Sequence, residues 1–221
     1  METSEFESIL RVDWDLPKKP YPPKVILLPT GEKMVVREIE REEVPMLLEA
    51  IRPLLTVSRD FYDIVAARAY AELLGWYRYR VRNEYALIGV VNGELAGVVN
   101  NRLLNEKTCI SLHTIAFRRG ARIGAHLFAA KQENAIENYG VEEILITAES
   151  PIGFRRWMVE WSLEPKVGVQ HELGGANAWV LTKENYFKIK PKLVFGQRPV
   201  PEDLYTQSLK PKVIIPDVVR E

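Results

Sequence analysis

The segment Phe117–Phe128 reads FRRGARIGAHLF and holds three arginines and two glycines. It follows TCISLHTIAF (residues 108–117), whose alternation of residue types predicts a β-strand. It opens AHLFAAKQENAIENY (residues 125–139), a helix pattern that stops at Gly140. The first N–H groups of a helix lack intrahelical partners and carry partial positive charge, and glycine lets the backbone approach an anion closely. The segment is therefore either a phosphate-binding turn or a solvated basic turn.

Further strand and helix patterns lie on both sides of this turn. Asn92-Gly93 joins two β-rich runs and is the strongest short-range hairpin signal. The other predicted elements are a strand at 33–39, helices at 40–55 and 59–76, a central apolar strand at 142–150, a short helix at 153–161 and a hairpin at 167–182. This order predicts an α/β (α+β) fold with a mixed central β-sheet of about six to seven strands flanked by helices.

Proline placement divides the chain into a domain and two arms. Ten of the fourteen prolines lie in the first 29 or the last 31 residues. Because proline removes a backbone donor and fixes φ, both ends are expected to be extended rather than helical. We expect an extended N-terminal arm at residues 1–31, a domain at 32–188 and an extended C-terminal arm at 189–221. Each arm is expected to pack on the domain, on another copy of the chain or on a partner.

Composition restricts the classes of function. Thirty basic residues balance thirty acidic ones, so net charge attracts the chain neither to nucleic acid nor to anionic membranes, and neither is an expected partner. The single cysteine, Cys109, cannot form an internal disulfide, which fits a reducing compartment. No signal peptide follows Met1, and no apolar run approaches the roughly 18 residues of a membrane span. These features predict a soluble, cytoplasmic protein.

The sequence resembles the GNAT superfamily of acyl-CoA N-acyltransferases over residues 33–182. Three stretches carry the resemblance: VVREIEREEVPMLLEAI (35–51), VVNGELAGVV (90–99) and RRGARIG (118–124) after a strand. The resemblance implies that acetyl-CoA, as cosubstrate, lies between the strand that ends at Phe117 and the one that ends at Ser150.

Its pyrophosphate would then rest on the turn that starts the following helix. The resemblance implies twelve cofactor-binding residues: Thr114, Ile115, Ala116, Phe117, Arg118, Arg119, Gly120, Ala121, Arg122, Ile123, Gly124 and Ala125.

Two positions depart from the family pattern. That pattern is Gln or Arg, two residues, Gly, one residue, then Gly or Ala, and its middle glycine position here holds Arg122. An arginine there either adds a charge-assisted phosphate contact or fills the space that the phosphate needs. The family's acid is often a Tyr in the short helix after the fifth strand. Met158 stands near that position and cannot donate a proton, so the usual acid is absent.

Transfer of an acyl group to an amine needs a base for the ammonium and an acid for the leaving thiolate. His113 is a candidate base because it lies beside the proposed groove, although a structural hydrogen-bonding role is the alternative. Glu149 is the other candidate, since burial at the end of an apolar strand would raise its pKa. His126 is expected to be a surface or packing residue. His171 is expected to be exposed, with a place in an acceptor cleft as the alternative.

The remaining reactive or aromatic residues are expected to be structural. Cys109 has no charge or histidine partner at a motif spacing and is expected to be a buried, inert thiol. Three histidines and one cysteine show no metal-ligand spacing, so no metal site is expected. The segment WYRYRVR (76–82) interleaves aromatic and basic residues as a single-strand nucleic-acid surface does. At zero net charge, packing of its aromatic residues is the favoured interpretation.

Two functions remain open. The first is an acyl-CoA-dependent N-acetyltransferase that modifies a primary amine of a small molecule or protein. The second is a catalytically inactive GNAT-fold component of an assembly, for example a viral particle or a multisubunit complex. Arg122, Met158 and two arms that could bind another copy or an assembly partner favour the second.

Overall fold

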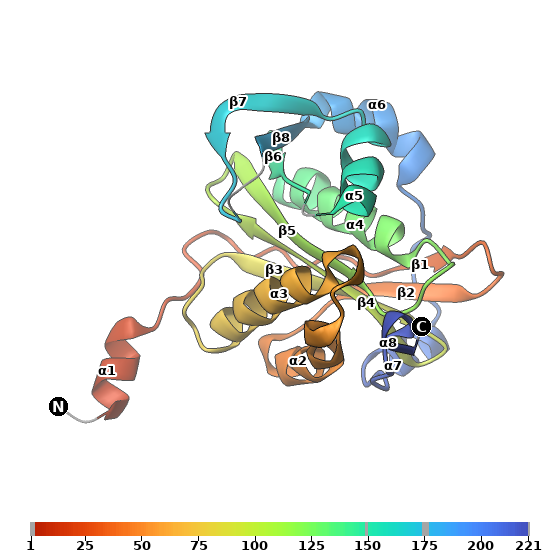
Figure 1. The fold of residues 1–221 in the computed structure, drawn as a ribbon, viewed down its shortest axis with the longest axis horizontal. Coiled ribbons are helices and arrows are strands. Elements are labelled where there is room, and N and C mark those ends of the chain that lie inside the picture. The colour runs from red at the N-terminus through yellow and green to blue at the C-terminus, as the bar shows by residue number, and fades with distance from the viewer. Residues whose placement is uncertain (1–2, 149, 174–176, 221) are drawn as a thin grey trace.

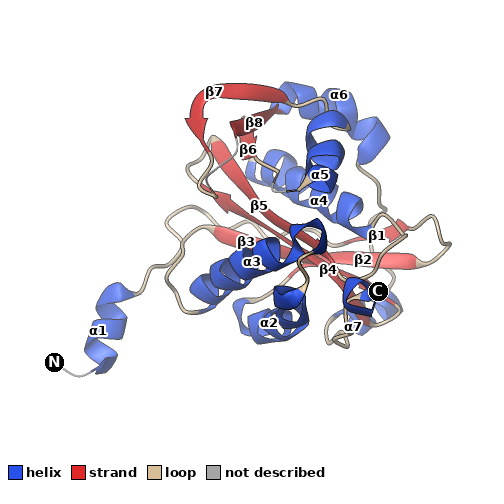
Figure 2. Ribbon diagram, viewed as in Figure 1, coloured by secondary structure: helices blue, strands red, loops and turns tan. Residues whose placement is uncertain are grey.

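The computed structural model describes residues 3–148, 150–173 and 177–220. These residues form an eight-stranded sheet in the order β1-β2-β3-β4-β5-β6-β8-β7, with helices on both faces (Figures 1 and 2). β5 and β6 are parallel, and the other neighbouring strands are antiparallel. The strands are β1 (Lys24–Leu27), β2 (Lys33–Glu38), β3 (Glu84–Val91), β4 (Glu94–Leu103), β5 (Thr108–Ala116), β6 (Glu143–Ile146), β7 (Glu164–Gln170) and β8 (Asn177–Thr182).

Helices α2 and α3 cover one face of the sheet, and α4 and α6 cover the other (Figure 1). The α-helices are α1 (Thr3–Leu10), α2 (Val44–Ile51), α3 (Tyr62–Tyr77), α4 (Ile123–Glu133), α5 (Pro151–Phe154), α6 (Lys183–Leu193), α7 (Glu202–Ser208) and α8 (Asp217–Arg220). Shorter helical turns are η1 (Arg41–Glu43), η2 (Arg52–Thr56), η3 (Arg59–Phe61), η4 (Asn134–Tyr139) and η5 (Arg155–Val159). Among the helices of the described residues, none has the length and apolar character that crossing a bilayer requires.

The structure confirms the predicted mixed sheet flanked by helices. Asn92 and Gly93 have φ values of 52° and 73°, as a tight hairpin turn requires, and they join β3 to β4. Every residue of β3 is buried, because α4 packs on one of its faces and the side chains of α2 and α3 cluster on the other. The sheet has one strand more than the upper limit of about six to seven that the element order suggested. The additional strand is β1, which comes from the N-terminal arm.

Gly97 in β4 shows how closely α4 and β5 approach this strand. A Cβ atom at this position would lie 2.7 Å from the main-chain oxygen of Ile115 and 2.8 Å from Cδ1 of Leu127. Because a backbone oxygen cannot move aside cheaply, Gly97→Ala is expected to reduce the free energy of unfolding by about 1–3 kcal/mol. Urea unfolding measures this. Gly124→Ala is the matched control, since its Cβ would meet no atom nearer than 3.7 Å. Equal destabilisation of both variants would contradict the packing argument.

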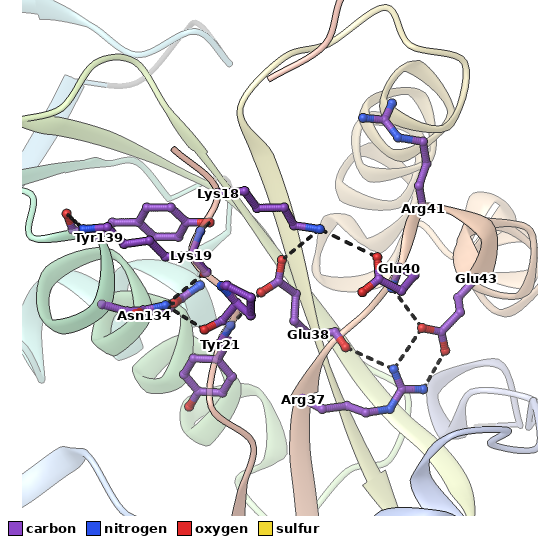
Figure 3. A network of polar contacts seen from close by, with 12 residues as sticks. Lys18, Lys19, Tyr21, Arg37, Glu38, Glu40, Arg41, Glu43, Asn134 and Tyr139 are labelled. Atoms are coloured by element: carbon purple, nitrogen blue, oxygen red, sulfur yellow. Dashed lines mark hydrogen bonds and ion pairs between the residues drawn. The ribbon is translucent and has the colours of Figure 1, made fainter. Parts of the chain in front are cut away.

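The N-terminal arm packs on the chain's own domain from Val12 onward, whereas α1 projects away from it (Figure 1). β1 pairs with β2 from Lys24 opposite Val36 to Leu27 opposite Lys33. Just before β1, the ammonium of Lys18 lies 3.6 Å from a carboxylate oxygen of Glu40 and 4.0 Å from one of Glu38 (Figure 3).

A further contact fixes the segment that leads into β1. The main-chain N–H of Tyr21 donates to Glu38 over 2.8 Å. These contacts match one of the three arrangements expected for the arms, which is packing on the chain's own domain.

The C-terminal arm also packs on the domain, at two strands. Gln197 exchanges two main-chain hydrogen bonds with Val25 of β1. Further along, the main-chain N–H of Lys212 donates to Gly93 over 2.8 Å, and its oxygen accepts from Leu95 over 2.9 Å. The arm thus ties the edge strand β1 to the start of β4.

The expectation that proline keeps both arms free of helix is wrong in part. The N-terminal arm contains α1, and the C-terminal arm contains α7 and α8. Proline is tolerated at a helix start, where its missing N–H has no intrahelical acceptor anyway. Pro201 caps α7, and Pro216 directly precedes α8. Pro191 lies in the last turn of α6.

Candidate functional site

A cleft forms where β5 and β6 separate. The two strands pair only from Thr108 opposite Glu143 to Ser111 opposite Ile146. β6 ends there, whereas β5 continues to Ala116. The cleft has a volume of about 300 Å³ and is lined by this second half of β5, the first turn of α4, and α5 with η5. One edge of β5 therefore borders the cleft rather than a neighbouring strand.

A β-bulge lies where β5 leaves β6. Val99 pairs with Thr114 and Asn101 with Ser111, so the single residue Asn100 of β4 stands opposite two residues of β5. Those two are Leu112 and His113, and both line the cleft. The side-chain oxygen of Asn100 accepts the main-chain N–H of His113 over 2.9 Å, which holds the bulge in place.

The turn before α4 has the conformation that a glycine-rich turn adopts. Gly120 has φ of 84°, and Arg122 has φ of 57° and caps the helix. Arg122 thus adopts a left-handed conformation, which favours glycine, at the position where the family pattern has glycine. Its guanidinium extends to Glu160 of the segment after η5, over 3.1 Å. Two residues on, Gly124 borders the cleft with room for a methyl group.

The cleft is basic although the chain as a whole is neutral. Among the described residues that line it, the charged ones are Asp60, Arg118, Arg119, Arg122, Lys131 and Arg156. All four arginines are paired: Arg118 with Glu32, Arg119 with Asp60, and both Arg122 and Arg156 with Glu160. The arginines gathered beside the positive end of α4 favour an anionic ligand.

Nine of the twelve expected cofactor-binding residues line the cleft: Thr114, Ala116, Arg118, Arg119, Gly120, Arg122, Ile123, Gly124 and Ala125. The side chains of Ile115, Phe117 and Ala121 are buried in the two hydrophobic cores instead. The main-chain groups of Phe117 are also occupied. Its N–H donates to Ala96, and its oxygen accepts from Asp217 in the C-terminal arm.

His113 lies at the cleft as expected, but as a buried side chain. Only 3% of its surface is exposed. Burial, with nearby Lys131, Arg68, His171 and Arg102, lowers the pKa of His113 to about 3. The imidazole is therefore neutral at pH 7. The other expected base, Glu149, lies outside the described residues.

The other two histidines are structural. His126 is buried against Phe195 with ring centroids 5.8 Å apart, and its pKa is lowered to about 4 mainly by burial. His126 is thus a packing residue, as expected. The expected exposure of His171 is wrong, because only 1% of it is exposed. Its Nε2 lies 3.1 Å from the main-chain oxygen of Ser111, so the residue packs under β5.

The cysteine and the methionine occupy core positions. Cys109 is fully buried, and burial raises the pKa of its thiol to about 12, so the prediction of a buried, inert thiol is confirmed. Met158 is also buried. It directly follows the cleft-lining residue Trp157 in the sequence. Trp157 stacks on Phe128 with ring centroids 4.0 Å apart. Within the described residues, no group of His, Cys, Asp and Glu is arranged as a metal site.

Sequence reasoning missed Lys131, which borders the cleft from α4. This side chain is fully buried, and its Nζ donates to the main-chain oxygen of His113 over 3.0 Å. Burial lowers the pKa of Lys131 to about 7. A signal was present in the sequence: Lys131 follows Leu127 and Phe128 at helical spacing, on an otherwise apolar face.

A second polar group lies on the opposite face of the sheet, toward α3. The side-chain nitrogen of Asn100 donates to Glu84 over 2.8 Å. Glu84 is fully buried, and burial raises its pKa to about 8 despite the neighbouring Arg102. Arg102 forms ion pairs with Glu72, Glu84 and Glu172. The bulge at His113 is thus contacted from one face by Asn100 and from the other by Lys131.

Comparisons with known proteins agree with this geometry. No family model matches the chain, and the search of curated proteins gave no match. Among solved structures, an uncharacterized protein from Bacillus halodurans is similar with a TM-score of 0.57 and 10% identity, over 79% of this chain and 97% of that one. The GNAT domain of S. lividans PAT is similar with a TM-score of 0.55 and 12% identity, over 76% and 99% of the two chains.

A third similar structure is spermidine N-acetyltransferase from Vibrio cholerae in complex with CoA and spermine. Its TM-score is 0.50 at 12% identity, over 70% of this chain and 98% of that one. At identities this low, the structural similarity establishes the fold alone. The chemistry has to be argued from the residues of the site. With its separated β5 and β6 strands and the turn before α4, this chain has the fold of the S. lividans PAT GNAT domain.

Proposed function

We propose that this protein is an acyl-CoA-dependent N-acyltransferase that transfers an acetyl group from acetyl-CoA to a primary amine. The observation that carries the proposal is the basic cleft between β5 and β6, which ends at the first turn of α4. A GNAT fold alone would not suffice, because one fold hosts many functions. The fold's similarity to an N-acetyltransferase solved with CoA and spermine adds support.

In this proposal, the pyrophosphate of acetyl-CoA rests on the turn from Arg119 to Ala125. The first N–H groups of α4 and the arginines of the turn supply its partners. The edge of β5 from Leu112 to Ala116 faces the cleft, so its main-chain groups can bind an extended ligand that contains amides, as a neighbouring strand would. The thioester would then reach the bulge at His113.

The reaction forms a C–N bond and breaks the C–S bond of the thioester. The amine first loses a proton, attacks the carbonyl carbon, and loses a second proton as the CoA thiolate leaves. With a pKa of about 3, His113 accepts protons poorly at pH 7, so its proposed role is to orient the amine. Glu149 remains the proposed base.

Thermal unfolding with and without acetyl-CoA tests the proposal. A ligand at about 100 times its dissociation constant stabilises the native state by about 2.7 kcal/mol, which raises the midpoint of a chain of this size by roughly 5–10 °C. We expect a rise of this order with acetyl-CoA and none with the same concentration of pantetheine, which lacks the pyrophosphate. An unchanged midpoint at millimolar acetyl-CoA would overturn the proposal.

A catalytically inactive GNAT-fold component is the second candidate, and the buried Met158 at the usual acid position favours it. The arms offer mixed support for assembly. Residues from Val12 onward in the N-terminal arm and the C-terminal arm contact the chain's own domain, whereas α1 projects from it with Phe6, Ile9 and Leu10 exposed (Figure 1). A protein that binds acetyl-CoA and releases no CoA with any amine of a broad panel would favour this candidate.

A further inference from the structure

Lys131 is a buried amine at the inner wall of the cleft. It lies on the side of α4 that packs against the sheet, and none of its surface is exposed. Its Nζ donates to the main-chain oxygen of His113 over 3.0 Å and lies 3.4 Å from that of Asn100. These two residues form the two sides of the bulge. Lys131 therefore contacts the point at which β5 turns away from β6.

A buried lysine is costly unless a carboxylate pairs with it. Within residues 3–148, 150–173 and 177–220, no carboxylate forms an ion pair with Lys131. The titratable groups around it are Cys109 and His113 of β5, His171 after β7, and Tyr85 of β3, whose hydroxyl donates to the main-chain oxygen of Lys131. Each of these groups is neutral at pH 7, since their pKa values lie far from 7.

This environment contrasts with that of the other buried lysine near α4. Lys24 is equally enclosed, but its Nζ lies 2.6 Å from a carboxylate oxygen of Glu133. Lys24 thus has the partner expected of a structural buried cation, and it does not line the cleft. Of the two buried amines, Lys131 is the one that borders the cleft, and no carboxylate in the described part of the chain forms an ion pair with it.

We propose that Lys131 transfers the proton that the leaving thiolate of CoA receives. This inference rests on the proposed function. It assigns the acid role, which Met158 cannot fill, to a residue on a different helix. Both main-chain oxygens near Nζ are acceptors, so two N–H bonds of the amine can point toward the bulge. The nitrogen keeps one further position that can accept or donate a proton, and Lys131 is among the residues that line the cleft.

The proton balance of the step is simple. In the tetrahedral intermediate, the nitrogen of the former amine carries an extra proton, and the sulfur of CoA is bonded to the same carbon. The neutral Lys131 takes the proton from that nitrogen. As the C–S bond breaks and its electron pair goes to sulfur, Lys131 gives the proton to the thiolate and returns to its neutral form. Because nitrogen and sulfur share one carbon, a single amine can reach both.

The test uses CoA itself, so it needs no knowledge of the acceptor amine. CoA is bound to the wild-type protein, to Lys131→Met and to Lys131→Gln, and the ultraviolet absorbance of the thiolate is followed as pH rises. An ammonium beside a thiol favours the thiolate and lowers the pKa of the thiol. Since burial lowers the pKa of Lys131 to about 7, the amine is charged only near and below that pH. Part of the thiolate is therefore expected to form near pH 7 in the wild-type protein and only at higher pH in either variant.

The two variants separate a proton-transfer role from a structural one. Glutamine keeps an N–H donor for the oxygen of His113 but cannot titrate, and it serves if the methionine variant does not fold. Lys188→Met is the control, since Lys188 is exposed on α6 and pairs with Glu184. It should titrate as the wild-type protein does.

The outcomes distinguish this inference from the proposed function. Thiolate formation at the same pH in the wild-type protein and in Lys131→Gln, with CoA bound to both, would overturn the role of Lys131 alone. Failure of CoA to raise the unfolding midpoint of the wild-type protein would overturn the proposed function, and the role of Lys131 with it.

Discussion

Replacing Gly124 by glutamate is expected to weaken acetyl-CoA binding by at least about 100-fold, or about 2.8 kcal/mol. Gly124 lies in the first turn of α4 and borders the cleft. A Cβ at this position would contact only Ala116 and Thr114, each at 3.7 Å, so a longer side chain can extend into the cleft. A carboxylate there would oppose the pyrophosphate through like charge and would fill its space. Titration calorimetry measures the loss.

The glutamate is not expected to unfold the protein, because negative charge is favourable at a helix N-terminus. Gly124→Ala is the matched control and should bind acetyl-CoA within a few-fold of the wild-type affinity. Gly120 is a poorer position for this test, because its φ of 84° makes any side chain strained. Unchanged affinity in a folded Gly124→Glu protein would place the ligand away from this turn.

Replacing Glu133 by alanine is expected to reduce the free energy of unfolding by about 3–5 kcal/mol. This buried carboxylate at the end of α4 binds both arms. One of its oxygens accepts from the hydroxyl of Tyr21 over 2.7 Å and from Lys24 over 2.6 Å. The other lies 3.1 Å from Arg198 of the C-terminal arm. Without Glu133, the buried ammonium of Lys24 loses the carboxylate that pairs with it, which is the costly case. Urea unfolding measures the effect.

The pH dependence of stability provides a second measurement at Glu133. Burial alone would raise the pKa of Glu133, but Lys24, Arg198 and Tyr21 outweigh burial and lower it. A carboxyl with a lowered folded pKa stabilises the protein above its unfolded pKa, and this contribution is lost as pH falls through the folded value. The stability gap between the wild-type protein and Glu133→Gln should therefore narrow in acid.

The control for the Glu133 variants is Glu184→Ala. It removes an exposed carboxylate that pairs with Lys188 on α6. Its unfolding midpoint should match that of the wild-type protein. If Glu133→Ala also unfolds at the wild-type midpoint, the arms are held by other contacts and the account of Glu133 is wrong.

Local patterns predicted most of the domain. The Asn92-Gly93 turn and the helical spacing in α2, α3 and α4 depend on residues close together in the chain, so sequence alone reveals them. The pairing of β1 with β2 and the docking of Lys212 on β4 depend on contacts between distant segments. The arms consequently appeared only as proline-rich ends with short apolar runs.

The candidate site was predicted unevenly for the same reason. The turn from Arg119 to Gly124 was recognisable because its glycines and arginines are adjacent in sequence. Lys131 was missed because a lysine on a helix is usually exposed, and its burial follows from how closely α4 packs on the sheet. His171 lies in the last predicted hairpin and was expected to be exposed, and only its contact with the main-chain oxygen of Ser111 shows otherwise.

Hydrogen exchange with and without acetyl-CoA tests the central claim most directly, because it locates the ligand without an assay for activity. The proposed site predicts slower exchange in residues 112–125, from the bulge of β5 through the first turn of α4, with little change in β1 or in the C-terminal arm. Slower exchange confined to the arms, or no change anywhere at saturating acetyl-CoA, would contradict binding between β5 and β6.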